Sequence, residues 1–323
     1  MPPDLTDAAH HSIAADLVAV LVAVTDGAPR VLTTRDASAL PSGPLERSHR
    51  SLQAGLRAWV EAQTHHPLGY VEQLYTFADS DRYDESGGEW HAISISYLAL
   101  TREAAASPDA GAGWQDWYRY FPWEDHRDGP PALLAGRIVP ALRAWVAAAP
   151  GSAERRMREQ RAAMTFGLGG HAWSEDAILQ RYELLYEAGL VAEARRRGGK
   201  GPAGRAGDAS LPTGEPMRHD HRRILATGIA RLRAKIKYRP VVFELMPPDF
   251  TLLQLQQTVE ALAGRPLHKQ NFRRLIEQQE LVEETGEVLA GGAGRPAKLF
   301  RFRRGVLLER AIAGSKLPLA RAQ

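Results

Sequence analysis

The 323-residue sequence contains no cysteine. This absence excludes disulfide bonds, thiolate metal sites and cysteine nucleophiles, and it is typical of a chain that works in a reducing compartment. Long apolar runs are also missing, since the longest one near the start covers only residues 17–24 and has no basic segment before it. A membrane span needs about 20 apolar residues, and a secretion signal starts with basic residues. We therefore expect a soluble, cytoplasmic protein with no membrane partner.

The length of the chain predicts two domains rather than one. The net charge of +3 is distributed unevenly between them. Residues 1–150 hold 11 basic and 19 acidic residues, a net charge of −8, whereas residues 216–323 hold 20 basic and 10 acidic residues, a net charge of +10. Such asymmetry is typical of a protein whose basic end binds a polyanion. Arginine-rich helices that merely face solvent are the alternative.

The first 150 residues alternate between strand and helix patterns. Apolar alternation on both sides of Asp26-Gly27 predicts a β-hairpin. Helical spacing of apolar residues is found in two later segments, and this order of elements predicts an α/β or α+β layered domain. The expected elements are strands over 13–24, 30–34, 70–77 and 93–100, helices over 51–63 and 132–148, and a loop over 40–44.

The middle of the chain differs in composition from both ends. Residues 152–195 are helical in pattern, and residues 195–216 are rich in Gly, Ala, Pro and Arg, which is typical of a linker. The aromatic segment 119–124 predicts the edge of a core, with stacking on a nucleobase as the alternative.

The last third predicts helices over 221–237, 252–263 and 267–279. Only Gly264-Arg-Pro separates the last two helices, with Thr251 as a cap in front of them, which is typical of a helix-turn-helix. The second helix of such a pair lies in the major groove of DNA, and here Phe272, Leu275 and Ile276 would form its buried face. The residues that could pair with bases or phosphates are Lys269, Gln270, Asn271, Arg273 and Arg274.

A glycine-rich hairpin over 282–302 follows, as in the wing of a winged helix. Arg295 and Lys298 lie on its returning arm, where they could follow a phosphate backbone. The predicted DNA-binding residues are therefore Thr251, Lys269, Gln270, Asn271, Arg273, Arg274, Arg295 and Lys298. A small helical domain that binds only proteins through a basic surface is the alternative.

Residues 43–64 can be compared with the box of Nudix hydrolases, whose glutamates hold Mg²⁺ against a diphosphate. With Gly43 at the start, His49 takes the first glutamate position, Arg57 the arginine, Ala58 the next glutamate, Trp59 an apolar position, Glu61 and Ala62 the last acidic pair, and Thr64 the final glycine. One remaining carboxylate makes a poor Mg²⁺ site, so we expect neither a metal site nor hydrolysis. Glu61 is instead expected to pair with Arg57 at i,i+4.

Several segments together resemble the Nudix-related transcriptional regulators of NAD biosynthesis, of the NrtR/NadQ type. They are 70–77 followed by Asp81-Arg82, then 96–100, 245–252, 271–274 and 294–297. The resemblance covers residues 13–150 and 218–303, and it implies an α+β chain with a Nudix-like α/β/α sandwich and a winged helix-turn-helix. The implied parts are a sensing domain over 13–150, a helical insertion and flexible linker over 151–216, and a DNA-binding domain over 217–310.

The resemblance also implies a function. It describes a homodimeric repressor, not an enzyme, that binds palindromic double-stranded operator DNA and responds to ADP-ribose, NAD or ATP without a required cofactor. Gln73, Thr76, Arg82 and Tyr97 lie on the segments that would face the effector. The alternatives are a Mg²⁺-dependent hydrolase with an appended nucleic-acid domain and a module that binds only protein partners.

Overall fold

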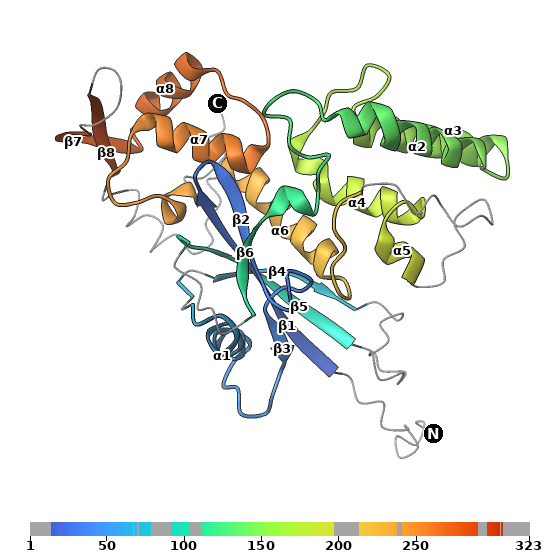
Figure 1. Cartoon of the computed structure of the whole chain (residues 1–323), viewed down its shortest axis with the longest axis horizontal. Coiled ribbons are helices and arrows are strands. Elements are labelled where there is room, and N and C mark those ends of the chain that lie inside the picture. The colour runs from blue at the N-terminus through green and yellow to red at the C-terminus, as the bar shows by residue number, and fades with distance from the viewer. Residues whose placement is uncertain are drawn as a thin grey trace, which may run out of the picture.

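A mixed six-stranded sheet forms the centre of the N-terminal part of the molecule (Figure 1). The computed structural model describes residues 14–66, 68–69, 71–78, 92–103, 111–196, 213–237, 241–289, 296–303 and 305. The strand order is β4-β5-β1-β2-β6, with β3 paired to β1, and only β1 and β5 are parallel to each other. The strands are β1 Ala14–Thr25, β2 Ala28–Thr33, β3 Ser42–Pro44, β4 Val71–Phe77, β5 Ala92–Leu100 and β6 Gly113–Asp116.

The predicted hairpin is confirmed, because β1 and β2 pair antiparallel around Asp26 and Gly27, which both have positive φ. The expected loop over 40–44 is wrong in its second half. Residues 42–44 form β3, which pairs with the first part of β1, and Leu45 continues the ladder with a hydrogen bond from its N–H to the Ala15 carbonyl (2.7 Å). The proline and glycine residues of this segment predict a loop. However, β2 pairs only with the last residues of β1, so the backbone N–H and C=O groups at the start of β1 need other partners, and β3 supplies them.

Helix α1, Leu52–Thr64, covers one face of the sheet. Ser51 caps it by accepting a hydrogen bond from the Ala54 N–H, and its apolar side chains Leu56 and Val60 are buried against the strands. The same buried cluster contains Leu17, Leu21 and Tyr97 from β1 and β5. The predicted helix over 51–63 is thus confirmed, together with the face that it buries.

Helix α6, His221–Ile236, packs on the opposite face. Gly228 allows the close approach, because a Cβ at this position would lie 2.9 Å from a methyl carbon of Val20. Ile224 and Ile229 belong to the same buried cluster as the strand residues on this face. The sequence predicts this helix as part of the DNA-binding domain, but in the structure it forms the second helical layer of the sandwich. The spacing of the apolar residues predicts the helix, but it does not predict which surface of the protein the helix packs against.

A group of helices extends from one side of the sandwich (Figure 1). It contains α2 Val139–Ala147, preceded by a π-helical turn at Leu134–Ile138, then α3 Ser152–Phe166, α4 Ile178–Glu187 and α5 Ala192–Arg196. Helix α4 packs on α6, and the aromatic segment before α2 is core, as predicted, because Tyr120, Phe121 and Trp123 are fully buried. Of the expected linker, residues 197–212 lie outside the described part.

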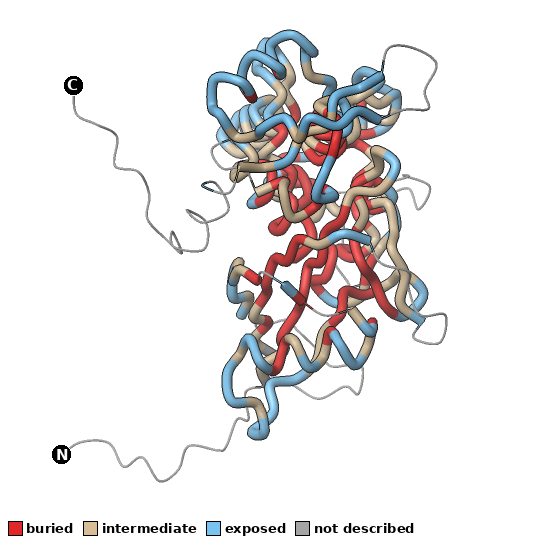
Figure 2. Tube along the Cα trace, turned by 90° about the vertical axis from the view of Figure 1, so that its left-hand side faces the viewer, coloured by how far each residue is buried: buried red, intermediate tan, exposed pale blue. Residues whose placement is uncertain are grey.

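The C-terminal part is a winged helix-turn-helix with α7 Leu252–Ala263, α8 Lys269–Gln278, β7 Val282–Leu289 and β8 Ala297–Phe302. The predicted helix pair and hairpin are confirmed. One buried cluster contains residues of the sheet, of α6 and of α7, so both parts share one core. Figure 2 shows buried segments in both the upper and the lower half of the molecule. Among the described residues, no helix is long and apolar enough to cross a membrane.

Candidate nucleic-acid interface

The turn between α7 and α8 sets the direction of the second helix. Gly264 ends α7 with φ 71°, a left-handed conformation that glycine adopts without strain. Phe272 and Ile276 on α8 are buried, as predicted, whereas Leu275 is 49% exposed, which corrects the expected buried face. The buried pair lies one turn apart and takes the centre of the face against α7, so Leu275 falls at its edge.

The outer face of α8 is basic and accessible. Lys269, Arg273 and Arg274 are exposed, as are Gln270 and Asn271 beside them. Within the described ranges, none of the three cations forms an ion pair. Their charge is therefore available to an anionic partner, and the neighbouring amides can both donate and accept hydrogen bonds.

The described cations of the wing, unlike those of α8, form ion pairs with glutamates. Lys298 pairs with Glu284 (2.8 Å) and Arg301 with Glu283 (2.7 Å), both across the β7–β8 ladder. Arg303 pairs with Glu280 (2.7 Å), and Arg295 lies outside the described residues. Sequence reasoning missed these pairs, although the run of glutamates on β7 opposite a basic β8 was the available signal. The wing thus offers less free positive charge than α8.

Thr251 has a structural role. Its hydroxyl accepts from the Gln254 N–H (3.2 Å), and the Gln254 side chain accepts in return from the Thr251 N–H (2.8 Å), which forms a capping box. The residue is 7% exposed, which leaves little surface for a phosphate. The predicted cap is confirmed, whereas the predicted DNA contact of Thr251 is not supported by so small an exposed surface.

Loss of this cap gives a first prediction. Thr251→Ala is expected to lower the free energy of unfolding by about 1 kcal/mol, whereas Thr251→Ser, which keeps the hydroxyl, loses clearly less. Urea unfolding monitored by circular dichroism measures both variants. Equal losses for alanine and serine would show that the hydroxyl does not cap α7.

Three of the four predicted effector residues lie on the α1 face of the sheet. In the antiparallel pair β4–β5, Gln73 lies opposite Tyr97 and Thr76 opposite Ile95, and directly opposed residues point to the same face. Gln73 and Thr76 are exposed, whereas Tyr97 is buried in the core under α1, and this burial raises the pKa of its hydroxyl. Arg82 lies outside the described residues.

The residues compared with the hydrolase box serve the fold. Gly43 lies against the indole of Trp59, where a Cβ would come within 2.3 Å of the ring, and the Trp59 Nε1–H donates to the Pro44 carbonyl (2.9 Å). The expected pair of Arg57 with Glu61 is wrong. Arg57 donates instead to the backbone carbonyls of Leu68 and Gly69, and so holds the segment that leads from α1 to β4.

Comparison with known proteins bears on both parts of the chain. Residues 242–302 match the model of the NrtR DNA-binding winged helix domain. A curated relative from Acinetobacter baylyi, the "ADPR responsive transcriptional repressor NtrR", is 42% identical over 83 residues. The aligned region covers 26% of this chain and only 33% of that relative.

Solved structures of two kinds of protein match almost the whole chain. The first, Shewanella oneidensis NrtR complexed with a 27mer DNA, gives a TM-score of 0.52 at 19% identity and covers 90% of this chain and 94% of its own. The second, a MutT/nudix family protein from Enterococcus faecalis, gives 0.51 at 18% identity and covers 94% and 89%. The predicted fold class is therefore confirmed. The chain is a Nudix-like sandwich that carries an NrtR-type winged-helix domain at residues 242–302.

Proposed function

We propose that this protein is a transcriptional repressor that binds operator DNA through α8 and responds to an NAD-related nucleotide. The observation that carries the proposal is the set of exposed cations on α8, which have no ion-pair partner in the described part of the chain and lie within a domain that matches the NrtR winged helix. Basic side chains at the start of a recognition helix neutralise phosphates. Arginine also pairs bidentately with guanine, and asparagine or glutamine with adenine. Arg273, Arg274, Asn271 and Gln270 supply these groups together.

ADP-ribose is the effector that we place first, before NAD and ATP. The relative from Acinetobacter baylyi is named for its response to ADPR, and Gln73 and Thr76 offer exposed polar groups on the α1 face. Arg82 stays a predicted contact, whereas Tyr97 is 1% exposed in the core under α1, so we do not propose it as a contact. No additional cofactor is needed for this role.

The proposed assembly is a homodimer on a palindromic site. Two winged helices related by a two-fold axis would bind half-sites about one or two helical turns apart. The parts that we propose are a sandwich that includes α6 and a DNA-binding domain that begins near Val242, because the family match starts after α6. This division differs from the predicted limits 13–150, 151–216 and 217–310, because α6 joins the sandwich.

The hydrolase alternative finds little support in the box. Ala58, Ala62 and His49 take three positions at which a hydrolase needs metal-binding glutamates. Arg57 donates its hydrogen bonds to two backbone carbonyls of the chain. Phosphoryl transfer depends on metal charge in the transition state. We therefore propose that the chain binds its nucleotide without turning it over.

The proposal is tested by selecting binding sites from a random duplex pool with the full chain. We expect enrichment of one palindromic sequence, which then serves as the operator in every later titration. In parallel, the chain is incubated with ADP-ribose or NAD and Mg²⁺ or Mn²⁺, and products are separated by chromatography. Failure to enrich any sequence, combined with multiple turnovers, would replace the repressor with the hydrolase.

A second prediction concerns the effector face. Gln73→Ala is expected to weaken ADP-ribose binding about 3- to 10-fold, the usual effect of losing one hydrogen bond, while unfolding is unchanged because the side chain is exposed. Calorimetric titration measures the affinity. Gln278→Ala, another exposed glutamine that lies on α8, is the matched control and should bind the nucleotide like the wild type. Equal affinity for both variants would remove Gln73 from the site.

A further inference from the structure

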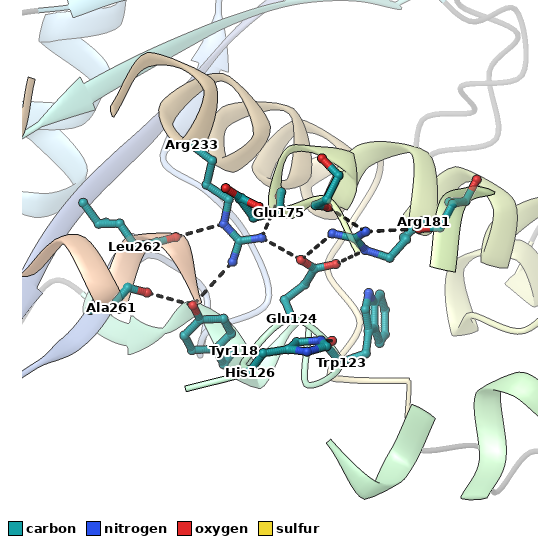
Figure 3. A network of polar contacts seen from close by, with 11 residues as sticks. Tyr118, Trp123, Glu124, His126, Glu175, Arg181, Arg233, Ala261 and Leu262 are labelled. Atoms are coloured by element: carbon teal, nitrogen blue, oxygen red, sulfur yellow. Dashed lines mark hydrogen bonds and ion pairs between the residues drawn. The ribbon is translucent and has the colours of Figure 1, made fainter. Parts of the chain in front are cut away.

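A fully buried carboxylate joins three separate parts of the chain. Glu124 lies between Arg181 of α4 and Arg233 of α6, and all three side chains are at most 1% exposed (Figure 3). Arg181 donates from Nε to Glu124 Oε1 (2.5 Å) and from Nη2 to Oε2 (2.9 Å), while Arg233 Nη1 donates to Oε2 (2.6 Å). Both carboxylate oxygens are therefore held by charged donors from two helices.

The second arginine continues the network into the winged helix. Arg233 Nε donates to the Leu262 carbonyl (2.9 Å), and the Tyr118 hydroxyl, 3.4 Å from Arg233 Nη2, donates to the Ala261 carbonyl (2.7 Å). The His126 N–H donates to the Gly264 carbonyl (2.7 Å). All three acceptors belong to the last turn of α7 or to the turn that directs α8.

The packing around Gly264 is equally close. A Cβ at this position would lie 2.4 Å from the Glu124 carbonyl oxygen and 2.8 Å from the Tyr118 hydroxyl. The turn before α8 therefore rests directly on the backbone and side chains of the Glu124 cluster. Charged hydrogen bonds in a dry site are strong and directional, and a displaced partner would leave a buried charge unpaired.

We infer that Glu124 is a positioning residue that fixes the winged helix, and with it the recognition helix α8, relative to the sheet. A rotation of α7 against α6 must break the bond from Arg233 to the Leu262 carbonyl, and a shift of α7 from the Glu124 segment must break the bonds from Tyr118 to Ala261 and from His126 to Gly264. The consequence for operator binding rests on the proposed function. The positioning itself does not, and it can be measured without DNA.

The molecule offers a matched control. Glu193 is also a buried carboxylate paired with a buried arginine, Arg222 (3.2 Å). Arg222 reaches the Tyr120 and Thr213 carbonyls, and Glu193 the Met217 N–H. In the described part of the chain this pair makes no hydrogen bond to α7 or α8. Neutralising it removes a similar buried charge without loosening the winged helix.

The first experiment uses the absence of cysteine. Spin labels at Glu61→Cys on α1 and Gln278→Cys on α8, both exposed positions, report the distance between the sheet and α8 by pulsed electron paramagnetic resonance. The labelled chain is diluted with an excess of unlabelled chain, so that only distances within one subunit are measured. We expect a single narrow distribution for the parent and for Glu193→Gln, and one at least twice as wide, or shifted, for Glu124→Gln. Tyr118→Phe removes only one hydroxyl, so it provides a folded variant if Glu124→Gln unfolds.

The inference is overturned if Tyr118→Phe shows the same distance distribution as the parent, and if Glu124→Gln, provided that it folds, shows the same distribution too. A second experiment compares operator affinities, where we expect a loss of at least tenfold for Glu124→Gln and less than threefold for Glu193→Gln. Equal losses would also contradict a positioning role. If the parent binds no selected DNA, the proposed function fails, while the label distances still decide the inference.

Discussion

Simultaneous replacement of Arg273 and Arg274 by alanine is expected to weaken binding to the selected operator about 100-fold. Each arginine that contacts a base or phosphate contributes about 1–3 kcal/mol, and a factor of ten corresponds to about 1.4 kcal/mol. Neither side chain has an ion-pair partner in the described chain, so its full charge is available to DNA. Both are exposed, and the double variant should unfold at the parental urea concentration.

The salt dependence distinguishes this effect from a general loss of charge. The slope of log affinity against log salt falls by about 0.9 for each phosphate contact removed, so we expect a smaller slope for the double variant. Lys298→Ala with Arg301→Ala is the matched control, since it also removes two cations, but both are paired with glutamates on β7. If this control loses as much affinity as the α8 variant, the wing and not α8 is the principal contact.

Glu124→Gln is expected to lower the free energy of unfolding at pH 7 by about 3–5 kcal/mol. The amide has no charge, so Arg181 and Arg233 remain buried without a counter-ion. Glu187→Gln is the surface control, because its pair with Arg161 is about 40% exposed and should contribute less than about 1 kcal/mol. Urea unfolding at constant pH measures both variants, and similar losses for the two would contradict the assigned role of the buried cluster.

The pKa of the Glu124 carboxyl group determines how the stability of the protein depends on pH. Burial alone would raise the pKa of Glu124, but the charges and hydrogen bonds of Arg181 and Arg233 outweigh it and hold the pKa below its ordinary value of 4.5. A carboxyl with a depressed folded-state pKa stabilises the fold above its unfolded pKa, and this contribution is lost as the pH falls through the folded value. Below pH 4.5 the parent should therefore lose stability more steeply than Glu124→Gln. The prediction would be contradicted if the free energy of unfolding fell equally steeply with decreasing pH in the parent and in Glu124→Gln.

Much of the fold could be predicted from local patterns in the sequence. The hairpin at Asp26-Gly27, the helix after Ser51 and the helix-turn-helix around Gly264 all depend on short-range turn, cap and period signals. The strand β3 and the position of α6 could not be predicted in this way. A strand of three residues and a helix that is buried on most sides are defined by the surfaces that they meet, and those surfaces come from distant parts of the chain.

Some residues of the candidate site could likewise be predicted from local sequence patterns, and others could not. The basic residues of α8 could be assigned from their place after the turn, and Phe272 and Ile276 from their spacing. The buried arginines were missed, although Arg181 lies three residues after Ile178 and Arg233 four after Ile229, each on an apolar helix face. An arginine at such a position indicates a buried counter-charge, but it does not show that Glu124, far away in sequence, supplies it.

The central claim, sequence-specific DNA binding that a nucleotide regulates, is tested most directly by one titration of the full chain. Fluorescence anisotropy compares the selected operator with a scrambled duplex at one salt concentration, with and without ADP-ribose. We predict that the operator binds at least about 10³-fold more tightly than the scrambled duplex and that ADP-ribose changes only the operator affinity, by at least about fivefold. Equal affinities for the two duplexes, unchanged by the nucleotide, would contradict it.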